Sequence, residues 1–345
     1  EMIAAILRTA YHDTADNAVI LAPQGNFNND IGLPLTLLKL AAKHRAAVVE
    51  LGMNHPGEIA ALTRLAAPTV ALVTNAQRAH LEGMGDLEAV AREKGSIYAG
   101  LQADGVALVN DEDAYAGLWR AQNAGRRVIG FGLTAASDIF GVAQLHGLET
   151  RLTLHTPQGQ ADIALSAPGR HNVMNALAAA AAAFALGLPL QTIAAGLENF
   201  RGVKGRLQRL SGSNGADILD DTYNANPDSV RAGIAVLAAT VGRKILVLGD
   251  MGEIGAGSLQ YHDEIGGYAK SMGIDALYAL GDASQQAARN FGAGGSSFST
   301  PEDLLKALQG EALHPGDTLL IKGSRFMKME RIVQALVSPS QEGEP

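Results

Sequence analysis

The chain has 345 residues, no cysteine and a formal net charge of −8, with 27 Lys and Arg against 35 Asp and Glu. The length suggests about two domains, each able to bury its own core, and the lack of cysteine excludes disulfides, thiolate metal sites and a cysteine nucleophile. The acidic balance argues against duplex-DNA binding, and no apolar run approaches the roughly 20 residues of a membrane span. We therefore expect a cytoplasmic protein with no nucleic-acid partner and no membrane insertion.

Short, continuous apolar runs alternate with helical patterns through the first half of the chain. Such runs predict strands buried on both faces of a parallel sheet, and the βαβ order predicts an α/β domain. The predicted strands are Ala18–Leu21, Ala46–Leu51, Val70–Thr74, Val106–Asn110 and Arg127–Phe131, and the predicted helices are Leu33–Leu40, Ile59–Leu65, Leu87–Leu101 and Ala114–Gln122.

The pattern changes to polar and apolar alternation from Ser137 to Ser166, which predicts an antiparallel hairpin appended to the sheet. Two helices, Asn172–Leu186 and Leu190–Asn199, follow it. A basic segment with glycines at 202 and 205 then precedes a second βαβ series. Its predicted strands are Asp217–Leu219, Lys244–Leu248, Ala276–Leu280 and Thr318–Ile321. These patterns predict domains at 1–202 and 203–337 and a disordered tail at 338–345.

Several polar residues follow predicted strands, where ligands gather in parallel α/β sheets. Glu50 ends one apolar run and His80 follows the next, so together they could hold a hard divalent cation. An exposed carboxylate and a loop histidine are the simpler alternatives. Lys94 has the pattern of an ordinary helix-surface lysine.

Asparagines mark two further candidate regions. Asn26, Asn28 and Asn29 crowd one loop and exceed what a single turn needs, which favours a polar-ligand loop over a plain turn. Asn172 and Asn175 are spaced i,i+3 on one helix face, where one could end the helix and the other could bind a purine edge.

The second half holds the most specific candidate. Two carboxylates and two asparagines in the run 220–226 follow a strand and precede a helix. The run 248–253 is similar to a dinucleotide-binding glycine turn but has the wrong glycine spacing. After the last strand, Arg325 could hold a carboxylate through its planar guanidinium.

Five of these motifs, in consistent order, closely resemble the Mur ligases. They are Gly25–Gly32, Glu50–Ile59, Ala79–Gly83, Gly169–Asn175 and Asp221–Asn226. Within the family, the best match is the type that joins D-alanyl-D-alanine to UDP-N-acetylmuramoyl-tripeptide. The resemblance implies a central ATPase domain with a mostly parallel sheet, followed by a Rossmann-like domain that receives the amino-acid substrate.

The resemblance also implies parts that the sequence does not contain. The family's phosphate loop should lie just before Glu1, and no G-x-x-x-x-G-K-S/T stretch occurs in the chain. We therefore expect a ligase chain that lacks its N-terminal UDP-binding domain and its phosphate loop, and that is inactive as given.

The family's site residues carry over by position. The resemblance implies that Glu50 and His80 bind Mg²⁺ and that Lys94 is carbamylated to add an anionic ligand, which reverses the reading of Lys94 as a surface residue. Catalytic roles are expected for Lys94, His80 and Arg206. The expected ATP-binding residues are Asn172, Asn175, Arg206 and Asp221. The expected substrate-binding residues are Asn28, Asn29, Asn54, His55, Tyr223, Asn224, Asn226 and Ser324, with Lys322 and Arg325 added on charge alone.

The implied reaction is ATP-dependent amide formation through an acyl-phosphate, in a protein that we expect to be a monomer. Two alternatives stay open. One is a folylpolyglutamate-synthase-type ligase, which uses the same scaffold, and the other is a non-catalytic substrate-binding fragment.

Overall fold

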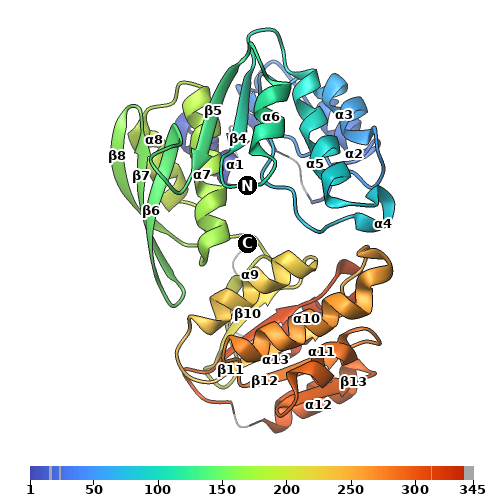
Figure 1. Ribbon diagram of the computed structural model, residues 1–345. Coiled ribbons are helices and arrows are strands. Elements are labelled where there is room, and N and C mark those ends of the chain that lie inside the picture. The colour runs from blue at the N-terminus through green and yellow to red at the C-terminus, as the bar shows by residue number, and fades with distance from the viewer. Residues whose placement is uncertain (15–17, 23–24, 312, 338–345) are drawn as a thin grey trace. The chain divides into compact units, whose positions relative to one another are not determined.

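The computed structural model describes residues 1–14, 18–22, 25–311 and 313–337 (Figure 1). The predicted tail at 338–345 lies outside the described residues. The chain divides into two compact units. Unit 1 comprises residues 1–144, 150–166 and 170–201, and unit 2 comprises residues 145–149, 167–169 and 202–345.

A six-stranded sheet of order β3-β4-β5-β6-β7-β8 forms the centre of unit 1. Its strands are β3 (Val70–Leu72), β4 (Val106–Asn110), β5 (Arg127–Gly132), β6 (Ile139–His146), β7 (Glu149–Thr156) and β8 (Gly159–Leu165). Strands β3 to β6 pair in parallel, whereas β7 and β8 pair antiparallel, which confirms the predicted appendage. Two short strands, β1 (Ile20–Leu21) and β2 (Ala46–Ala47), form a separate parallel pair.

Helices cover both faces of this sheet. On one face α7 packs against β3, β4 and β5. On the other face alternate residues of β3 and β4 pack with Trp119 and Tyr98 in one apolar cluster. The α-helices of unit 1 are α1 (Met2–Tyr11), α2 (Gly32–Leu37), α3 (Glu58–Ala66), α4 (Leu81–Met84), α5 (Leu87–Gly95), α6 (Ala116–Gln122), α7 (Arg170–Ala185) and α8 (Leu190–Glu198), and η1 (Ser96–Gly100) is a 3₁₀ helix.

Close packing of α1 on α8 depends on Gly196. A Cβ atom at this position would lie 2.4 Å from the Cα of Ile6, which is fully buried on α1. We expect Gly196→Ala to destabilise unit 1 by about 1–3 kcal/mol, because the helix backbones must move apart. Urea unfolding measures this effect, and Gly117→Ala on α6, where an added Cβ meets nothing within 4 Å, is the control. Equal stability of the two variants would contradict the prediction.

Unit 2 is a sandwich of three layers around the sheet β13-β12-β11-β14-β10-β9. Its strands are β9 (Gln208–Ser211), β10 (Asp217–Asp221), β11 (Lys244–Gly249), β12 (Ala276–Leu280), β13 (Gly295–Phe298) and β14 (Thr318–Lys322). All neighbours pair in parallel except β9 with β10. β14, the last strand among the residues that the structure describes, lies between β10 and β11.

Alternation along the strands separates two apolar cores in unit 2. Leu246 and Leu248 of β11 face a cluster with α9, α10 and α11, whereas Ile245 and Val247 face a cluster with α12 and α13. The helices are α9 (Pro227–Ala238), α10 (Ser258–Ser271), α11 (Ser284–Phe291), α12 (Pro301–Gly310) and α13 (Glu330–Leu336), with 3₁₀ turns η2 (Gly255–Gly257) and η3 (Arg325–Met327). The α/β class expected from the sequence is confirmed.

Candidate functional sites

Glu50 does not end a strand, because β2 stops at Ala47. The strand predicted over Ala46–Leu51 was therefore too long, and Glu50 lies in the segment that follows it. The Glu50 side chain is tied to the asparagine loop, since Asn28 Nδ2 donates a 2.9 Å hydrogen bond to Glu50 Oε1. The amide of Gly52 donates to the Asn28 carbonyl over 2.7 Å. The asparagine loop and the segment after β2 therefore form one structure.

Asn29 has a local role in the same loop. Its Oδ1 accepts hydrogen bonds from the amides of Ile31 and Gly32, at 3.2 and 2.7 Å, at the start of α2. Hydrogen bonds from an asparagine side chain to amides two and three residues further on are typical of an Asx turn. The Asn28 side chain instead reaches another segment, so the two neighbours have different functions.

The turn at Asn54 and His55 is held by the first residue of α3. Glu58 Oε2 accepts from the amides of Asn54 and His55, at 2.6 and 2.9 Å. These backbone hydrogen bonds hold the pKa of the Glu58 carboxyl below its usual value. The His55 ring lies beside the same carboxylate, with its Nδ1 3.4 Å from Glu58 Oε1, although the His55 side chain is 71% exposed.

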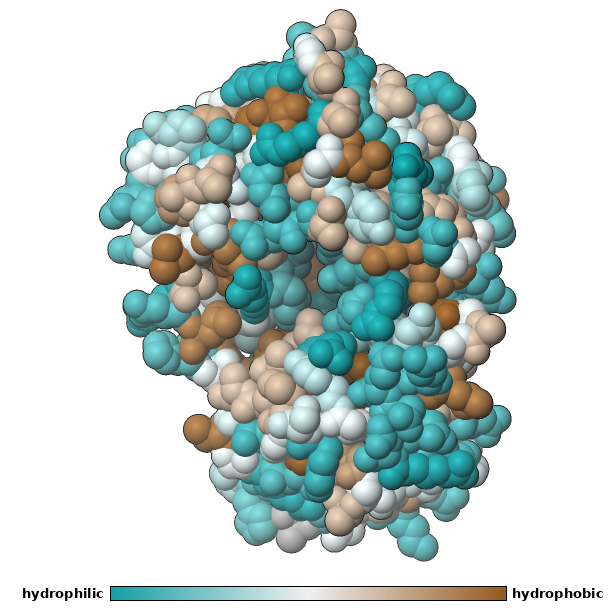
Figure 2. Space-filling model, viewed as in Figure 1, coloured by the Kyte–Doolittle hydropathy of each residue, from teal (hydrophilic) through white to brown (hydrophobic). Residues whose placement is uncertain are grey.

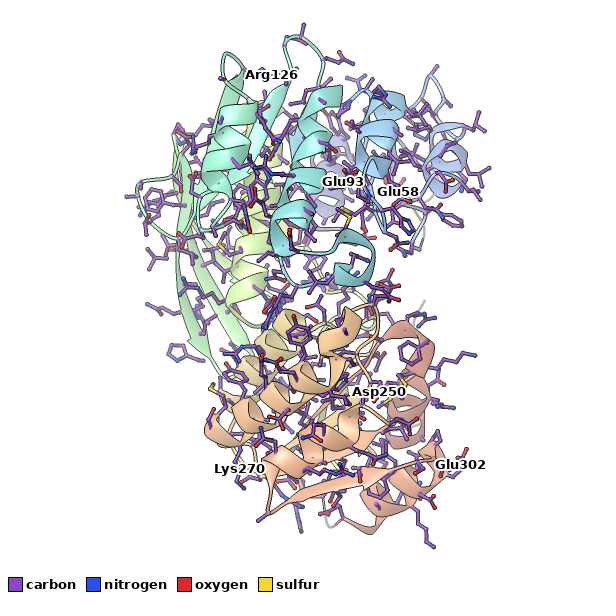
Figure 3. The ribbon with its side chains drawn as sticks, turned by 45° about the vertical axis from the view of Figure 1, so that its right-hand side comes forward. Glu58, Glu93, Arg126, Asp250, Lys270 and Glu302 are labelled. Carbon is purple, nitrogen blue, oxygen red and sulfur yellow. The ribbon has the colours of Figure 1, made fainter. Side chains whose placement is uncertain are left out.

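Glu93 is a buried carboxylate that sequence reasoning missed. Its two oxygens accept 2.8 Å hydrogen bonds from the amides of Gly57 and Ile59, at the start of α3 (Figure 3). A carboxylate at a helix N-terminus satisfies free amides and complements the helix dipole. No spacing in the sequence marks this contact, since Glu93 lies on α5, more than thirty residues away from its partners.

Lys94, the next residue on α5, also contacts backbone outside its own helix. Lys94 Nζ donates a 2.9 Å hydrogen bond to the Asn75 carbonyl, just past β3. Burial lowers the pKa of the Lys94 amine, and the charge of Asp113 only partly opposes this shift. Lys94 is therefore not the exposed surface lysine that its helix pattern alone suggests.

His80 begins α4 in the left-handed conformation, with φ of 58°. Helix α4 packs on the Asn54 turn, because a Cβ added at Gly83 would lie 2.0 Å from the Asn54 carbonyl oxygen. The segments that carry Glu50, His80 and Lys94 are thus linked by contacts within unit 1. Within the described ranges, no group of three or more His, Asp and Glu side chains is arranged to hold a metal.

Asn172 and Asn175 lie in the first turns of α7, which begins at Arg170. Asn175 Nδ2 donates to Asn172 Oδ1 over 3.2 Å, so the predicted spacing does bring the two side chains together. The Asn175 side chain is exposed and can offer its remaining groups to a ligand.

In unit 2, a buried ion pair stands at the carboxyl ends of β10 and β14. Lys322 Nζ donates to Asp221 Oδ2 at 2.6 Å and to the Asn224 carbonyl at 2.9 Å. The Lys322 side chain is 3% exposed and that of Asp221 is 14% exposed. Lys322 therefore ties the 221–224 segment to the sheet.

Arg206 and Tyr223 come together at the same end of the sheet. The guanidinium carbon of Arg206 lies 4.1 Å from the centroid of the Tyr223 ring, a cation–π contact. The amide of Tyr223 donates to the Gly205 carbonyl over 3.0 Å. The glycine-containing segment at 202–206, within unit 2, is thus fastened to the candidate run 220–226.

Asn226 and Arg325 have partners within their own helices or turns. Asn226 is the N-cap of α9 and forms a capping box with Ser229. Arg325 Nη1 donates to Glu330 Oε1 over 3.2 Å, at an exposed position. Asn226 therefore has a structural role at α9 besides the substrate contact expected for it, whereas Arg325 keeps donors free for a carboxylate.

Ser324 joins three loops at the carboxyl edge of the unit 2 sheet. Its Oγ donates to the Ala225 carbonyl at 3.1 Å and accepts from the Gly252 amide at 2.7 Å. Its amide donates to the Asp250 carbonyl at 3.0 Å. Ser324 is 3% exposed, so these three contacts enclose its hydroxyl within the loops.

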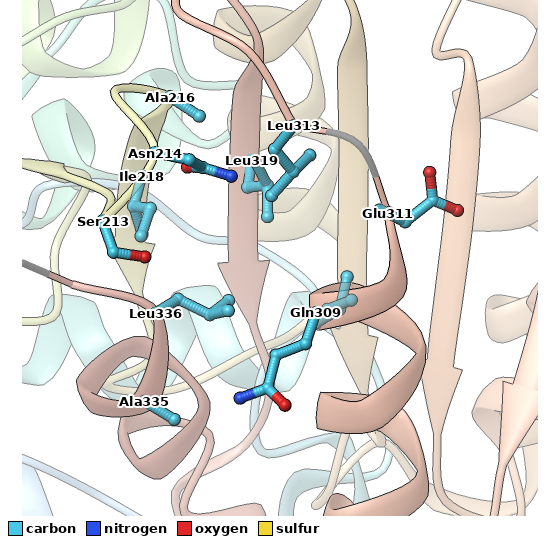
Figure 4. Close-up of a pocket in the computed structure, with 11 residues that line it drawn as sticks. Ser213, Asn214, Ala216, Ile218, Gln309, Glu311, Leu313, Leu319, Ala335 and Leu336 are labelled. Atoms are coloured by element: carbon cyan, nitrogen blue, oxygen red, sulfur yellow. The ribbon is translucent and has the colours of Figure 1, made fainter.

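A cavity of about 150 Å³ lies elsewhere in unit 2 (Figure 4). It lies beside the amino-terminal ends of β10 and β14, whereas the site residues predicted in unit 2 lie at or beyond the carboxyl ends of these two strands. None of the predicted site residues lines it. Its lining residues are Ser213, Asn214, Ala216, Ile218, Leu308, Gln309, Glu311, Leu313, Leu319, Ala335 and Leu336.

Comparison with models of protein families shows to which family the chain is related. Residues 1–183 match the Mur ligase middle domain, and residues 205–325 match the Mur ligase, glutamate ligase domain. The chain belongs to the Mur ligase family. This confirms the resemblance inferred from the five motifs, and ligases of this family are ATP-dependent enzymes.

Curated and solved Mur ligases extend the match over nearly the whole chain. It is 42% identical to the UDP-N-acetylmuramoyl-tripeptide–D-alanyl-D-alanine ligase of Escherichia coli, over 97% of this chain and 73% of that protein. It is 41% identical to the ligase of the same name from Haemophilus influenzae, with the same coverage. The crystal structure of MurF from Acinetobacter baumannii superposes with a TM-score of 0.88 at 35% identity, covering 96% of this chain and 73% of that one.

On the face shown in Figure 2, hydrophilic residues predominate and hydrophobic ones are scattered. Among the helices that the structure describes, none combines the length and the apolar character needed to cross a bilayer.

Proposed function

We propose that this chain belongs to a ligase that joins D-Ala-D-Ala to UDP-MurNAc-tripeptide in peptidoglycan precursor synthesis. The observation that carries the proposal is its 42% identity to a ligase of that name over 97% of the chain. The order and local geometry of the predicted motifs agree with it. We infer a cytoplasmic location and a monomer from the same relationship.

The proposed chemistry proceeds in two steps. The tripeptide carboxylate attacks the γ-phosphorus of ATP, which forms an acyl-phosphate and releases ADP. The amine of D-Ala-D-Ala then attacks the acyl carbon, so that phosphate leaves, the amine loses a proton and the amide bond forms. Since an anionic carboxylate must approach an anionic phosphate, the reaction requires fixed positive charge around the transferred group.

Glu50, His80 and a carbamylated Lys94 are the residues that would hold Mg²⁺. Carbamylation requires an uncharged amine, and burial lowers the pKa of Lys94, which increases the uncharged fraction. The product is a carboxylate-like oxygen donor, the ligand type that Mg²⁺ prefers. When bound, Mg²⁺ neutralises phosphate charge.

The remaining assignments separate by unit. Asn172 and Asn175 on unit 1 are proposed for ATP binding, and Arg206 with its Tyr223 partner on unit 2 for a nucleotide contact. The proposed substrate contacts on unit 1 are Asn28, Asn29, Asn54 and His55, and those on unit 2 are Tyr223, Asn224, Asn226, Ser324 and Arg325. The contacts described above support a structural role for Lys322 and Asp221, since each neutralises the other.

The proposal is tested with a form of the protein that has a phosphate loop ahead of Glu1. Phosphate release should require UDP-MurNAc-tripeptide and D-Ala-D-Ala together. Dependence on a folate and glutamate instead would favour the folylpolyglutamate-type alternative, which the relatives do not support. Binding of both substrates without any turnover would favour the non-catalytic alternative.

For the 345-residue chain itself, we expect weak ATP binding and no ligase activity. Its sequence contains no G-x-x-x-x-G-K-S/T stretch, whose amides and lysine hold the β- and γ-phosphates in such loops. Calorimetric titration with ATP and Mg²⁺ should give a dissociation constant of about 1 mM or weaker, equivalent to about −4 kcal/mol. A dissociation constant in the low micromolar range would contradict this expectation.

A further inference from the structure

His262 is a fully buried histidine on α10 that the proposed reaction does not use. Its Nε2 lies 3.0 Å from the Met251 amide nitrogen, and its Nδ1 lies 2.7 Å from the Ser258 carbonyl oxygen. The Met251 amide can only donate, so Nε2 must accept, and the ring proton is then on Nδ1 and donates to Ser258. The neutral ring in this one tautomer satisfies both contacts.

The amide that His262 holds belongs to the loop after β11. The next residue, Gly252, donates its amide to Ser324 Oγ over 2.7 Å. Gly252 also lies under the ring of Phe326, because an added Cβ would be 2.8 Å from Phe326 Cε1. Phe326 is 63% exposed, although it is a large apolar residue beside the buried Ser324.

We propose that His262 is a positioning residue, which sets the amine-substrate surface formed by Gly252, Ser324 and Phe326. The proposal rests on the proposed function, in which this end of unit 2 receives D-Ala-D-Ala. An apolar side chain would fill the same place in the core, so the specific contribution of the imidazole is its hydrogen bond to the loop. Phe326 offers an apolar face for the alanyl methyl groups, and Arg325 beside it offers a guanidinium for the dipeptide carboxylate.

The surroundings of His262 keep its ring neutral. Burial lowers the pKa of the imidazole, whereas the Ser258 carbonyl and the charge of Asp250 partly oppose the shift. Asp250 is itself engaged, because its carboxylate accepts from the amides of Ala283 and Ser284 at the start of α11 (Figure 3). The acceptor at Nε2 is therefore present at neutral pH.

The test compares His262→Leu with His262→Gln in the 345-residue chain. Amide hydrogen exchange should show that Met251 and Gly252 exchange at least about tenfold faster in His262→Leu, while the amides of β12 stay protected, because one buried amide loses its acceptor. NMR titration with D-Ala-D-Ala should show about tenfold weaker binding. His262→Gln, which retains an acceptor, should recover most of both effects, and His314→Leu, at an exposed histidine of unit 2, should behave as the wild type.

The outcomes distinguish the positioning role of His262 from the assignment of this surface to D-Ala-D-Ala in the proposed function. If the wild type does not bind D-Ala-D-Ala, the assignment of this surface in the proposed function is wrong, and amide exchange still decides whether His262 fixes the loop. If the wild type binds and His262→Leu binds equally well, the positioning role is wrong. Should His262→Leu fail to fold, Gly252→Ala provides the second test, since it displaces Phe326 directly. Unchanged dipeptide affinity in Gly252→Ala would overturn the proposed surface.

Discussion

Replacing Lys94 by alanine should abolish the proposed ligase activity, and added acetate or bicarbonate should restore part of it. The reason is that the carbamate proposed at Lys94 supplies an anionic ligand, which a small soluble anion can replace in the space that the side chain leaves. The expected loss is at least about a hundredfold in kcat, comparable with removal of one electrostatic group that acts on the transition state. Phosphate release is the measurement, in a form of the protein that carries a phosphate loop.

Two controls keep this prediction specific. Lys39→Ala replaces an exposed lysine of unit 1 and should leave turnover unchanged. In the 345-residue chain, ¹³C-bicarbonate should give a carbamate NMR signal that Lys94→Ala and Lys94→Arg both lack. If amines rescue Lys94→Ala and carboxylates do not, the lysine acts as a cation and the carbamate hypothesis is wrong.

Replacing Lys322 by methionine should destabilise unit 2 by about 3–5 kcal/mol, because it leaves the Asp221 carboxylate without its buried partner. Methionine has a similar length, so loss of packing contributes little. Thermal and urea unfolding followed by circular dichroism measure the change.

A double-variant comparison identifies the cause. Asp221→Asn combined with Lys322→Met should be less destabilising than the sum of the two single changes, because no unpaired charge is then buried. Lys306→Met, on the exposed face of α12, is the matched control. Additive effects would show that the two side chains stabilise unit 2 independently, contrary to the expectation.

Local patterns predicted most of the fold, for reasons visible in particular strands. Val106–Asn110 and Ala276–Leu280 are found with the predicted bounds, because all five residues of each are buried and only Asn110, at the end of its strand, interrupts the apolar character. β9 and β13 were missed, since Gln208–Ser211 and Gly295–Phe298 are edge strands with polar sequences. Neither has the continuous apolar run that marked the other strands, although β9 pairs with β10 and β13 with β12, each its neighbour along the chain.

For the candidate sites, some residues could be selected from the sequence, but their contacts could not. Position after a strand was enough to select Asp221, and family resemblance added Lys94. The partners of these residues could not be predicted: the Asp221 contact with Lys322 spans 101 residues, and that of Lys94 with Asn75 depends on tertiary packing. Glu93 and His262 were overlooked because a buried acid or histidine inside a helix has no sequence signature until its backbone partners are known.

The place of β14 has a consequence for how the protein is made. Synthesis proceeds from the N-terminus, so β10 and β11 leave the ribosome long before the strand that separates them in the finished sheet. Until residues 318–322 emerge, the middle of the unit 2 sheet is missing and the edges of β10 and β11 have no correct neighbour. In the six-stranded sheet of unit 1, strands β3 to β8 follow one another in chain order, so this sheet can form as it is synthesised, whereas the sheet of unit 2 must wait for residues 318–322. A chain that stops before residue 318 would therefore leave the facing edges of β10 and β11 open to aggregation, with unit 1 already synthesised.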